Sequence, residues 1–420
     1  MKKILLGTTA LIGAALLAGA ASAEDPKVTV GGFSTFEAGW VSSDFDANKQ
    51  NQSFRNDNEV HFNVAGKTDA GLGYGAEIDL QADIDGADSA SGAGANGFSQ
   101  SGIVARRTYG WLQGDQWGHV EFGSNEGAAA TLKVDASNIA RASGGINGDW
   151  RFFADTNANG TGAAPAAGFA GGRQFITSAN LPVENGPATG FFSDAFTNDT
   201  KITYYTPRFS GFQLGVSYVP ELADRGEADG RYDGGFAVGT SPGATNVWEG
   251  GINYENQFDQ IGVAVAATGE TGNTNGFVFT PGTSNLNNIN AWNLGAKLSY
   301  MGWSLAGSYG DWSDSENVSS TSAWYATGGL AYETGPFGAS VTYLYSQDKF
   351  NGTTATSQNN KFQDVSVGVD YKLAPGLTPF IEYTYYDIDP TDGTGANAPS
   401  GAGFGENKGN VVILGTQLSF

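Results

Sequence analysis

The chain has no cysteine among its 420 residues. Disulfides, thiolate metal sites and a cysteine nucleophile are therefore excluded, and an exported chain of this length must obtain its stability elsewhere. Histidine is almost as scarce, with only His61 and His119. Neither residue lies in a nucleophile-elbow pattern, and the acidic residues form no distinctive cluster along the sequence. We therefore expect no enzymatic activity.

Long hydrophobic runs are missing everywhere except at the N-terminus. There, two lysines precede a mostly apolar stretch over Ile4–Ala20, and Ala21-Ser22-Ala23 has the small residues of a cleavage site. This order is typical of a secretory signal peptide over residues 1–23, which leaves a mature chain of residues 24–420. No later stretch approaches the roughly 18 apolar residues of a spanning helix, so the sequence predicts no transmembrane helix.

Basic residues are few, because 21 Lys and Arg stand against 43 Asp and Glu, for a net charge of −22. This charge argues against a nucleic acid partner and suits a surface that meets divalent cations or repels anions. Glycine, by contrast, is abundant at 63 residues, and aromatic residues make up 12% of the chain. Together with a slightly polar mean hydropathy of −0.26, this composition fits a β-barrel in which only alternate residues face lipid.

Short alternating runs follow one another along the whole chain. Within 74–84, for example, Glu77 and Asp79 share one face, whereas Ile78 and Leu80 share the other. Seven tight turns alternate with eight long polar loops, so that fifteen connections join sixteen strands. The tight turns contain Ala70–Gly73, Asp115–Gly118, Ser210-Gly211, Asp259-Gln260, Met301-Gly302, Gly335-Pro336 and Pro375-Gly376.

An even number of strands with short turns on one side is typical of an outer-membrane barrel. A soluble sandwich would alternate in the same way with its aliphatic residues packed inward, but the turn asymmetry and the aromatic residues near strand ends favour the barrel. The last strand alternates up to Phe420 and would expose an unpaired edge unless it pairs with the first strand, near 28–42. We predict an all-β fold, a 16-stranded antiparallel transmembrane β-barrel.

The longest connection lies between a strand ending near Gly123 and another starting near Thr200. Connections of this length are usually functional or disordered, and a sixteen-stranded barrel leaves an aqueous channel into which such a segment can fold. We predict that this third loop, about residues 124–199, folds inward and narrows the lumen. The pattern over Ala128–Ala142 favours a short helix within it.

Three glycine- and aromatic-rich segments follow in order: Gly66–Glu77, Arg106–Gly114 and Trp117–Gly123. With the terminal Phe420, their order and spacing resemble those of Gram-negative general diffusion porins of the alphaproteobacterial type. The resemblance implies a homotrimer of sixteen-stranded barrels in the outer membrane, with short turns on the periplasmic side and loop carboxylates opposite a basic wall. It also implies that the barrel-assembly machinery reads Phe420, and that lipopolysaccharide surrounds the barrel.

Arg106 lies where this family has an inward-facing arginine on the fourth strand. The local alternation agrees, because it puts Arg106 and Thr108 inside the barrel and Tyr109 and Trp111 outside. Arg107 would then face outward, toward lipopolysaccharide or a neighbouring subunit. The alternative is that Arg106 lies at the rim and binds lipid headgroups or a neighbouring carboxylate.

Two more basic residues, His61 and Lys67, share the polar face of the second strand and extend the predicted basic wall. Opposite this wall we expect the acidic residues of the long loop, which are Glu126, Asp135, Asp149 and Asp155.

These features predict passive diffusion of small hydrophilic solutes and ions, because opposed charges across a narrow waist orient water and dipolar solutes. The acid excess predicts a weak cation preference. The alternative is a substrate-selective channel, for example for sugars, with Tyr325 and Phe380 facing the lumen. We expect neither a cofactor nor a dedicated metal site. Loosely bound Ca²⁺ is conceivable at the acid pairs in Asp44-Phe45-Asp46 and Asp387-Ile388-Asp389, although neither has the spacing of a calcium loop.

Overall fold

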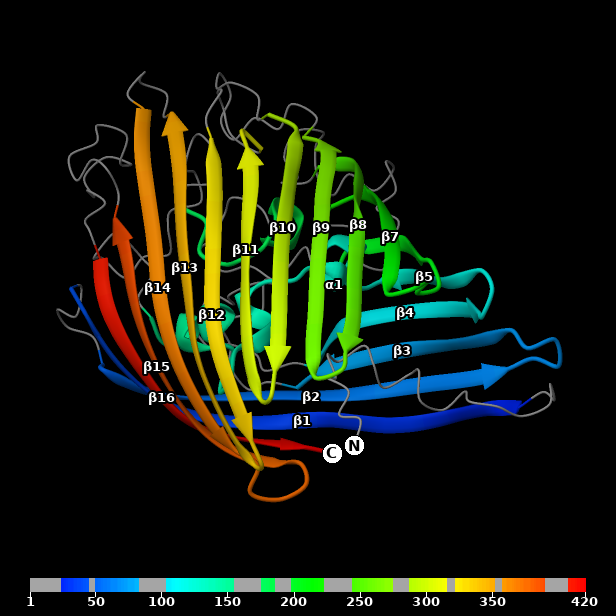
Figure 1. Cartoon of the computed structure of the whole chain (residues 1–420), viewed down its shortest axis with the longest axis horizontal. Coiled ribbons are helices and arrows are strands. Elements are labelled where there is room, and N and C mark those ends of the chain that lie inside the picture. Colours follow the sequence, from blue (N-terminus) through cyan, green and yellow to red (C-terminus); the bar gives the residue numbers. More distant parts are fainter. Residues whose placement is uncertain are drawn as a thin grey trace, which may run out of the picture.

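In a computed structural model of the chain, sixteen antiparallel strands form one closed barrel (Figure 1). The structure describes residues 24–44, 50–82, 103–154, 175–185, 198–222, 244–274, 287–315, 322–351, 357–389 and 407–420. The strands are β1 (Glu24–Ser43), β2 (Gln52–Lys67), β3 (Gly73–Gln81), β4 (Val104–Gly114), β5 (Gly118–Ser124), β6 (Thr200–Tyr205), β7 (Phe212–Glu221), β8 (Thr245–Phe258), β9 (Ile261–Asn273), β10 (Ile289–Tyr300), β11 (Trp303–Ser313), β12 (Ala323–Thr334), β13 (Phe337–Asn351), β14 (Ser357–Tyr371), β15 (Leu377–Asp389) and β16 (Asn407–Ser419). The predicted fold class is confirmed.

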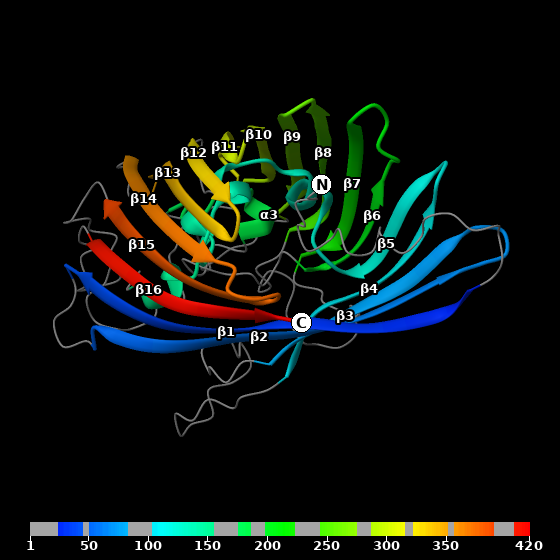
Figure 2. The ribbon, with the colours of Figure 1, turned by 60° about the horizontal axis from the view of Figure 1, so that its bottom comes forward.

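The barrel closes where β16 pairs with β1. The register runs from Phe33 opposite Ser419 to Ser43 opposite Gly409. The backbones of Gly32 and Phe420 extend this ladder, because each N–H donates to the other residue's carbonyl oxygen at 3.0 Å. Figure 2 shows β16 lying beside β1 along the near wall. Closure leaves no unpaired sheet edge, which is the condition for strands to cross a bilayer.

All seven predicted tight turns join consecutive strands. The turn between β10 and β11 has Met301 and Gly302 at φ 47° and 87°. Positive φ at both central residues is the geometry of a type I′ hairpin, whose twist matches that of the flanking strands. Ser210 and Gly211, in the turn between β6 and β7, repeat the pattern at φ 49° and 92°. The turn chemistry of the sequence was therefore sufficient to place these hairpins.

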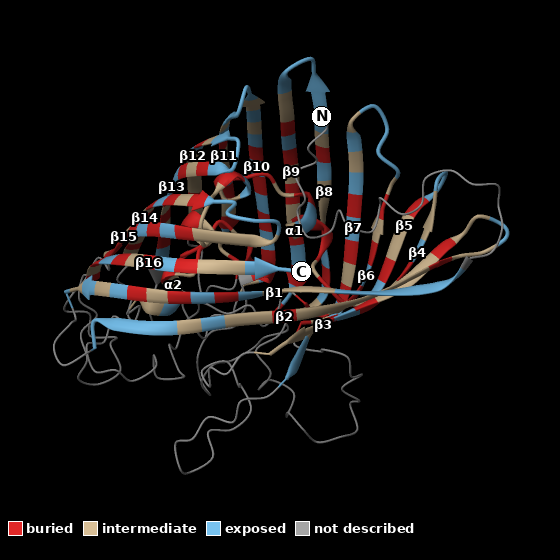
Figure 3. Cartoon of the chain, turned by 90° about the horizontal axis from the view of Figure 1, so that it is seen from below, coloured by how far each residue is buried: buried red, intermediate tan, exposed pale blue. Residues whose placement is uncertain are grey.

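The strands alternate between a buried inner face and an exposed outer face (Figure 3). On β15, for example, Glu382 and Thr384 are buried, whereas Ile381 and Tyr383, which alternate with them, are exposed. The outer face is apolar on every side of the barrel, as Val216, Leu294, Leu330 and Leu414 illustrate. This is the pattern of a wall with lipid outside and polar groups inside, and the inverse of a soluble sandwich.

The described part of the segment between β5 and β6 lies inside the barrel (Figure 2). Its described part holds five short helices: α1 (Ala128–Leu132), η2 (Ala136–Ile139), η3 (Gly145–Asn147), α2 (Trp150–Phe153) and α3 (Pro182–Asn185). We call the described residues within 125–185 the inner segment. The inner segment follows the wall: α1 packs against β6–β9, η2 against β11–β13, η3 against β13–β14, and α2 against β1 and β16. No helix of the described chain is long and apolar enough to span a membrane.

The helix expected over 128–142 is instead broken into α1 and η2. Lys133, the C-cap of α1, has extended backbone angles. Asp135 then caps η2, because its side chain accepts a hydrogen bond from the Ser137 N–H while the Asn138 side chain binds the Asp135 N–H. This reciprocal capping starts a new helix rather than continuing the old one.

The inner segment is held by an apolar cluster on the inner side of β10–β16. Trp150 of α2 is fully buried there and stacks on Tyr386, with ring centroids 5.5 Å apart and an interplanar angle of 20°. The cluster also contains Ile146 and Ile176 from the segment and Leu344, Phe362, Ile388, Val411 and Ile413 from the wall. Apolar residues on the inner face of the barrel would be unfavourable in a water-filled lumen, and the inner segment that covers them accounts for their presence.

Candidate functional site

The inner faces of β1–β4 carry a dense row of charged side chains, hereafter the charged wall. Period-two alternation along β2 puts four of its members on one face, and the strand registers place Glu37 opposite Arg55 and His61 opposite Asp79. The wall comprises Glu37, Arg55, Asp57, Glu59, His61, Glu77, Asp79, Arg106 and Arg107.

Arg107 lies at the centre of the charged wall and is only 5% exposed. Its Nε donates to Asp79 Oδ2 at 2.7 Å. Its two terminal nitrogens lie 3.7 Å from Glu77 Oε1 and 3.9 Å from Glu126 Oε1. The prediction that Arg107 faces outward is therefore wrong, and this buried guanidinium joins two strands of the wall to the inner segment.

The predicted inner and outer faces of β4 are exchanged from Arg107 onward. Tyr109 and Trp111, which were predicted to face outward, are also buried inside the barrel. The cause is a bulge in the β3–β4 ladder. Asp79 pairs with Arg107 and Leu80 pairs with Ala105, so Arg106 is the extra residue. One inserted residue shifts the alternation by one position, and no simple count along the sequence reveals it.

Arg106, at this bulge, forms an ion pair with Glu59 of β2 through Nη1 and Oε1. Glu59 is buried on the inner face, and its other oxygen, Oε2, lies 2.9 Å from His61 Nε2. The structure thus brings Arg106 and His61 together around one carboxylate. It does not bring Lys67 to them, because Lys67 is six residues farther along β2, about 20 Å away beside the turn to β3.

Two of the predicted loop carboxylates face the charged wall. Glu126 approaches Arg107 as described, and Asp149 Oδ2 lies 3.3 Å from Arg55 Nη1. Asp135 is fully buried at the start of η2, 3.5 Å from Lys133 Nζ, and its described contacts lie within the inner segment itself. Asp155 lies outside the described residues.

Arg55 and Glu37 belong to the wall but were missed from the sequence. Arg55 Nη1 lies 3.2 Å from Glu37 Oε2, and its guanidinium carbon lies 3.9 Å from the centroid of the Phe152 ring in α2. Arg55 therefore connects β1, β2 and the inner segment. The sequence could have indicated Arg55, because it lies an even number of residues from Glu59 on β2 and therefore shares its face. Glu37 lies in a strand whose sequence alternates poorly, so its face could not be predicted.

A second set of ionic contacts fastens the inner segment to β12, β14 and β15. Arg141 binds Asp370 of β14 with two hydrogen bonds of 2.7 Å and also contacts Glu333. Glu382 of β15 accepts hydrogen bonds from the Ser143 hydroxyl at 2.6 Å and from the Gly145 N–H at 3.0 Å. Charge-assisted bonds of this kind contribute roughly 1.5–3 kcal/mol each, so they resist withdrawal of the segment from the lumen.

Within the segment, Lys133 Nζ joins the two described stretches. It donates to the Ala179 carbonyl oxygen at 2.8 Å and lies 3.1 Å from Glu184 Oε2. Burial lowers the pKa of Lys133, but the carboxylates of Glu184 and Asp135 raise the pKa more, and the net direction is upward. The ammonium group therefore stays charged and keeps this cross-link at physiological pH.

The residues predicted to stack on sugars or to bind Ca²⁺ lie away from the charged wall. Tyr325 and Phe380 do face inward, but both are buried in the apolar cluster beneath the inner segment. Asp387 lies 3.7 Å from Lys408 Nζ, and Asp44 Oδ2 accepts a hydrogen bond from the Lys408 N–H at 3.2 Å. Asp46 lies outside the described residues.

Comparisons with known proteins agree with this architecture. A family model described as Gram-negative porin matches residues 7–391. An uncharacterized protein of Rickettsia typhi is 24% identical over 459 residues, which cover 95% of this chain and 94% of that protein. An uncharacterized protein of Rickettsia felis is 24% identical over the full length of both chains.

Solved porin structures share the fold at low sequence identity. An anion-selective porin from Comamonas acidovorans has a TM-score of 0.57 at 14% identity. A mutant of the Rh. blastica porin has a TM-score of 0.53, also at 14% identity. In both cases the likeness covers 94% of this chain and 100% of the other. The family match and the closed sixteen-stranded barrel together establish that this chain belongs to the Gram-negative porin family, as an outer-membrane channel rather than an enzyme.

Proposed function

We propose that the channel passes small hydrophilic solutes and ions by diffusion, with a weak preference for cations. The observation that supports this preference is the charge of the buried side chains. Among the residues that the structure describes, fifteen buried side chains are carboxylic acids, whereas two, Arg107 and Lys201, are basic. An inner surface rich in carboxylates raises the local concentration of cations and lowers that of anions.

We further propose that the inner segment, the described part of the loop of about residues 124–199, narrows the lumen beside its contacts with the charged wall. Glu126 of the segment faces Arg107, and Asp149 faces Arg55. Charges of opposite sign that border the remaining passage produce a local field that orients dipolar solutes and disfavours apolar ones. Arg106 and His61 take part through Glu59, whereas Lys67 acts nearer the turn end of the barrel.

Reversal potentials in a tenfold KCl gradient test the selectivity. We expect the reversal potential to have the sign of cation preference and to stay well below the ~59 mV of a perfectly selective monovalent channel. The double variant Glu126→Gln/Asp149→Asn should shift the potential toward zero, because it removes two carboxylates beside the passage. The control variant Glu255→Gln, at the turn end of β8, should shift it less. A reversal potential of the anion-selective sign in the unmodified protein would contradict the proposal.

We also infer that three copies assemble in the outer membrane. One structural relative, OmpT of Vibrio cholerae, is described in a trimer form. On this chain, Phe36 and Phe54 pack together on the outer face of β1–β2, with ring centroids 5.6 Å apart, and both remain exposed. Exposed aromatic surface of this kind can bind lipid or another subunit. Sedimentation in detergent should give the mass of three chains, and a single-chain mass at all concentrations would refute the trimer.

Export and assembly complete the proposal. Residues 1–23 would be removed as a signal peptide during export. The Phe420 side chain is exposed although its backbone pairs with Gly32, so the barrel-assembly machinery could bind the aromatic ring before closure. Lipopolysaccharide would cover the outer face on the side of the long loops.

A further inference from the structure

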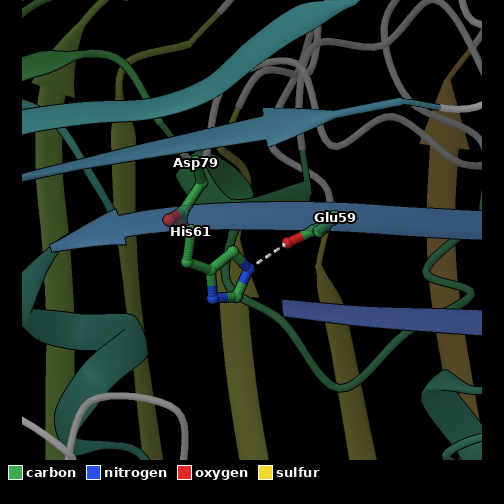
Figure 4. A group of neighbouring side chains, drawn as sticks. All are labelled: Glu59, His61 and Asp79. Atoms are coloured by element: carbon green, nitrogen blue, oxygen red, sulfur yellow. Dashed lines mark hydrogen bonds and ion pairs between the residues drawn. The ribbon is translucent and has the colours of Figure 1, made fainter. Parts of the chain in front are cut away.

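One group of side chains on the charged wall has the composition of a metal site. Glu59 and His61 come from β2 and Asp79 from β3, and one potential ligand atom from each lies within 4.8 Å of the others (Figure 4). The group arises because His61 is directly opposite Asp79 in the β2–β3 ladder, while Glu59 is two residues away on the same face. No other such group of three occurs among the residues that the structure describes.

The two carboxylates are held by arginines through one oxygen each. Arg106 binds Glu59 Oε1, which leaves Oε2 beside the imidazole, and Arg107 binds Asp79 Oδ2. Outer partners of this kind orient metal ligands and limit their freedom before the ion arrives. The wall therefore supplies ligands that are already positioned by neighbouring groups.

The second oxygen of Asp79 is the observation that points most directly to a cation ligand. Asp79 is fully buried, and Oδ1 has no hydrogen-bond partner among the described residues. A buried carboxylate oxygen without a partner loses its hydration and gains no hydrogen bond in return, which destabilises the wall. A cation bound at Oδ1 would remove this cost.

We propose that Glu59, His61 and Asp79 bind one divalent transition-metal ion, with Zn²⁺ as the best match. Zinc accepts imidazole and carboxylate ligands at about 2.0–2.2 Å, commonly with three protein ligands and a water molecule. Tetrahedral geometry then places the ligand atoms about 3.3 Å apart. The His61–Glu59 pair at 2.9 Å is already near that spacing, and a carboxylate oxygen of Asp79 lies within 4.8 Å of both. Calcium, which takes six to eight oxygen ligands, fits this group poorly.

The nearby arginines set a limit on affinity. Arg106 and Arg107 repel a cation, but Glu77 and Glu126 lie 3.7 and 3.9 Å from Arg107 and offset part of that charge. Together with Glu59 and Asp79, these residues give four carboxylates against two arginines. While the His61 imidazole is uncharged, the group therefore carries an excess of negative charge that a divalent cation can balance. We therefore expect a dissociation constant in the micromolar range.

Calorimetric titration of the full-length mature protein with ZnCl₂ tests the site directly. The protein is stripped of metal with a chelator, exchanged into chelator-free buffer and kept folded in detergent. We expect one Zn²⁺ per chain, and a loss of affinity of about 10-fold or more in the variant His61→Gln. Asp79→Asn should weaken binding to a similar degree, because it keeps the shape of the side chain and removes its charge.

The second histidine provides the matched control. His119 Nε2 lies 3.0 Å from Glu121 Oε1, so it reproduces the histidine–carboxylate pair, but it belongs to no group of three within the described chain. His119→Gln should therefore bind Zn²⁺ as the unmodified protein does. Circular dichroism of the strands, compared among all four proteins, checks that each barrel has folded.

Equal Zn²⁺ affinity in His61→Gln and the unmodified protein would overturn the proposal, as would an equal loss in His119→Gln. Replacement of ZnCl₂ by CaCl₂ should give at least 10-fold weaker binding, and Ca²⁺ binding as tight as that of Zn²⁺ would refute the assignment of the metal. Zinc should also reduce single-channel conductance through the unmodified protein. That second effect rests on the proposed channel, whereas the calorimetric result does not, so the two ideas fail separately.

Discussion

Replacement of Gly295 by leucine is expected to push the inner segment off the wall and to raise single-channel conductance. Gly295 is on the inner face of β10, where a Cβ would overlap the carbonyl oxygen of Val134 in the segment. A backbone oxygen cannot rotate away as a side chain does, so the segment itself must move. Val134 would then lose its packing against Ala264 and Ala266, which is worth about 1.5–3 kcal/mol.

Gly328 provides the control for this substitution. It is also a strand glycine, on β12, but a Cβ there meets no atom within 4 Å. Gly328→Leu should therefore leave the conductance near that of the unmodified protein. Planar-bilayer recordings measure both variants, and limited proteolysis of the inner segment reports its release. A folded Gly295→Leu barrel with unchanged conductance and unchanged proteolysis would show that the segment does not control the passage.

Trp150→Ala should have the second large effect, which is that η3 and α2 of the inner segment lose their attachment to the wall. Trp150 is fully buried, stacks on both Tyr386 and Phe362, and donates its Nε1–H to the Gly145 carbonyl oxygen at 3.1 Å. Truncation of a buried tryptophan to alanine costs about 3–5 kcal/mol. We expect this cost to appear as local opening of η3 and α2, because the strand ladders of the barrel do not depend on the indole.

Hydrogen exchange separates local opening from unfolding of the barrel. In Trp150→Ala, amides of η3 and α2, such as Gly148 N–H, which donates to Gly145 O at 2.8 Å, should exchange faster, while amides of β10 and β11 keep their protection. Trp303→Ala removes an exposed tryptophan beside the β10–β11 turn and should leave the segment unchanged. Faster exchange throughout the Trp150→Ala barrel would instead show that Trp150 contributes to the stability of the whole barrel.

The sixteen-stranded barrel could be predicted because its signals are local. Alternation on β3 separates Glu77 and Asp79 from Ile78 within a few residues, and turn pairs such as Met301-Gly302 need no distant partner. The position of the long segment between β5 and β6 was equally visible as a gap in the alternation. Strand ends were less well defined, since the expected strand over 74–84 continues past the described end of β3 at Gln81.

The candidate site was predicted only in part, since its membership depends on distant contacts. Arg106, His61, Glu126 and Asp149 do lie on the charged wall or face it. Asp135, by contrast, is used to cap a helix, and that role depends on where η2 begins. Arg107 lies on the inner face rather than the predicted outer face because of a bulge in the pairing of β4 with β3.

By itself, the sequence determined the strands, the tight turns and the polar character of the inner face, because residue spacing and turn chemistry act over a few residues. Only the tertiary structure decided which charges meet. Glu59, His61 and Asp79 come together through the register of two strands, and Arg55 meets Asp149 through a segment about ninety residues farther along the chain. Such contacts depend on how the closed barrel and its inner segment pack, and residue spacing along the chain carries little information about that packing.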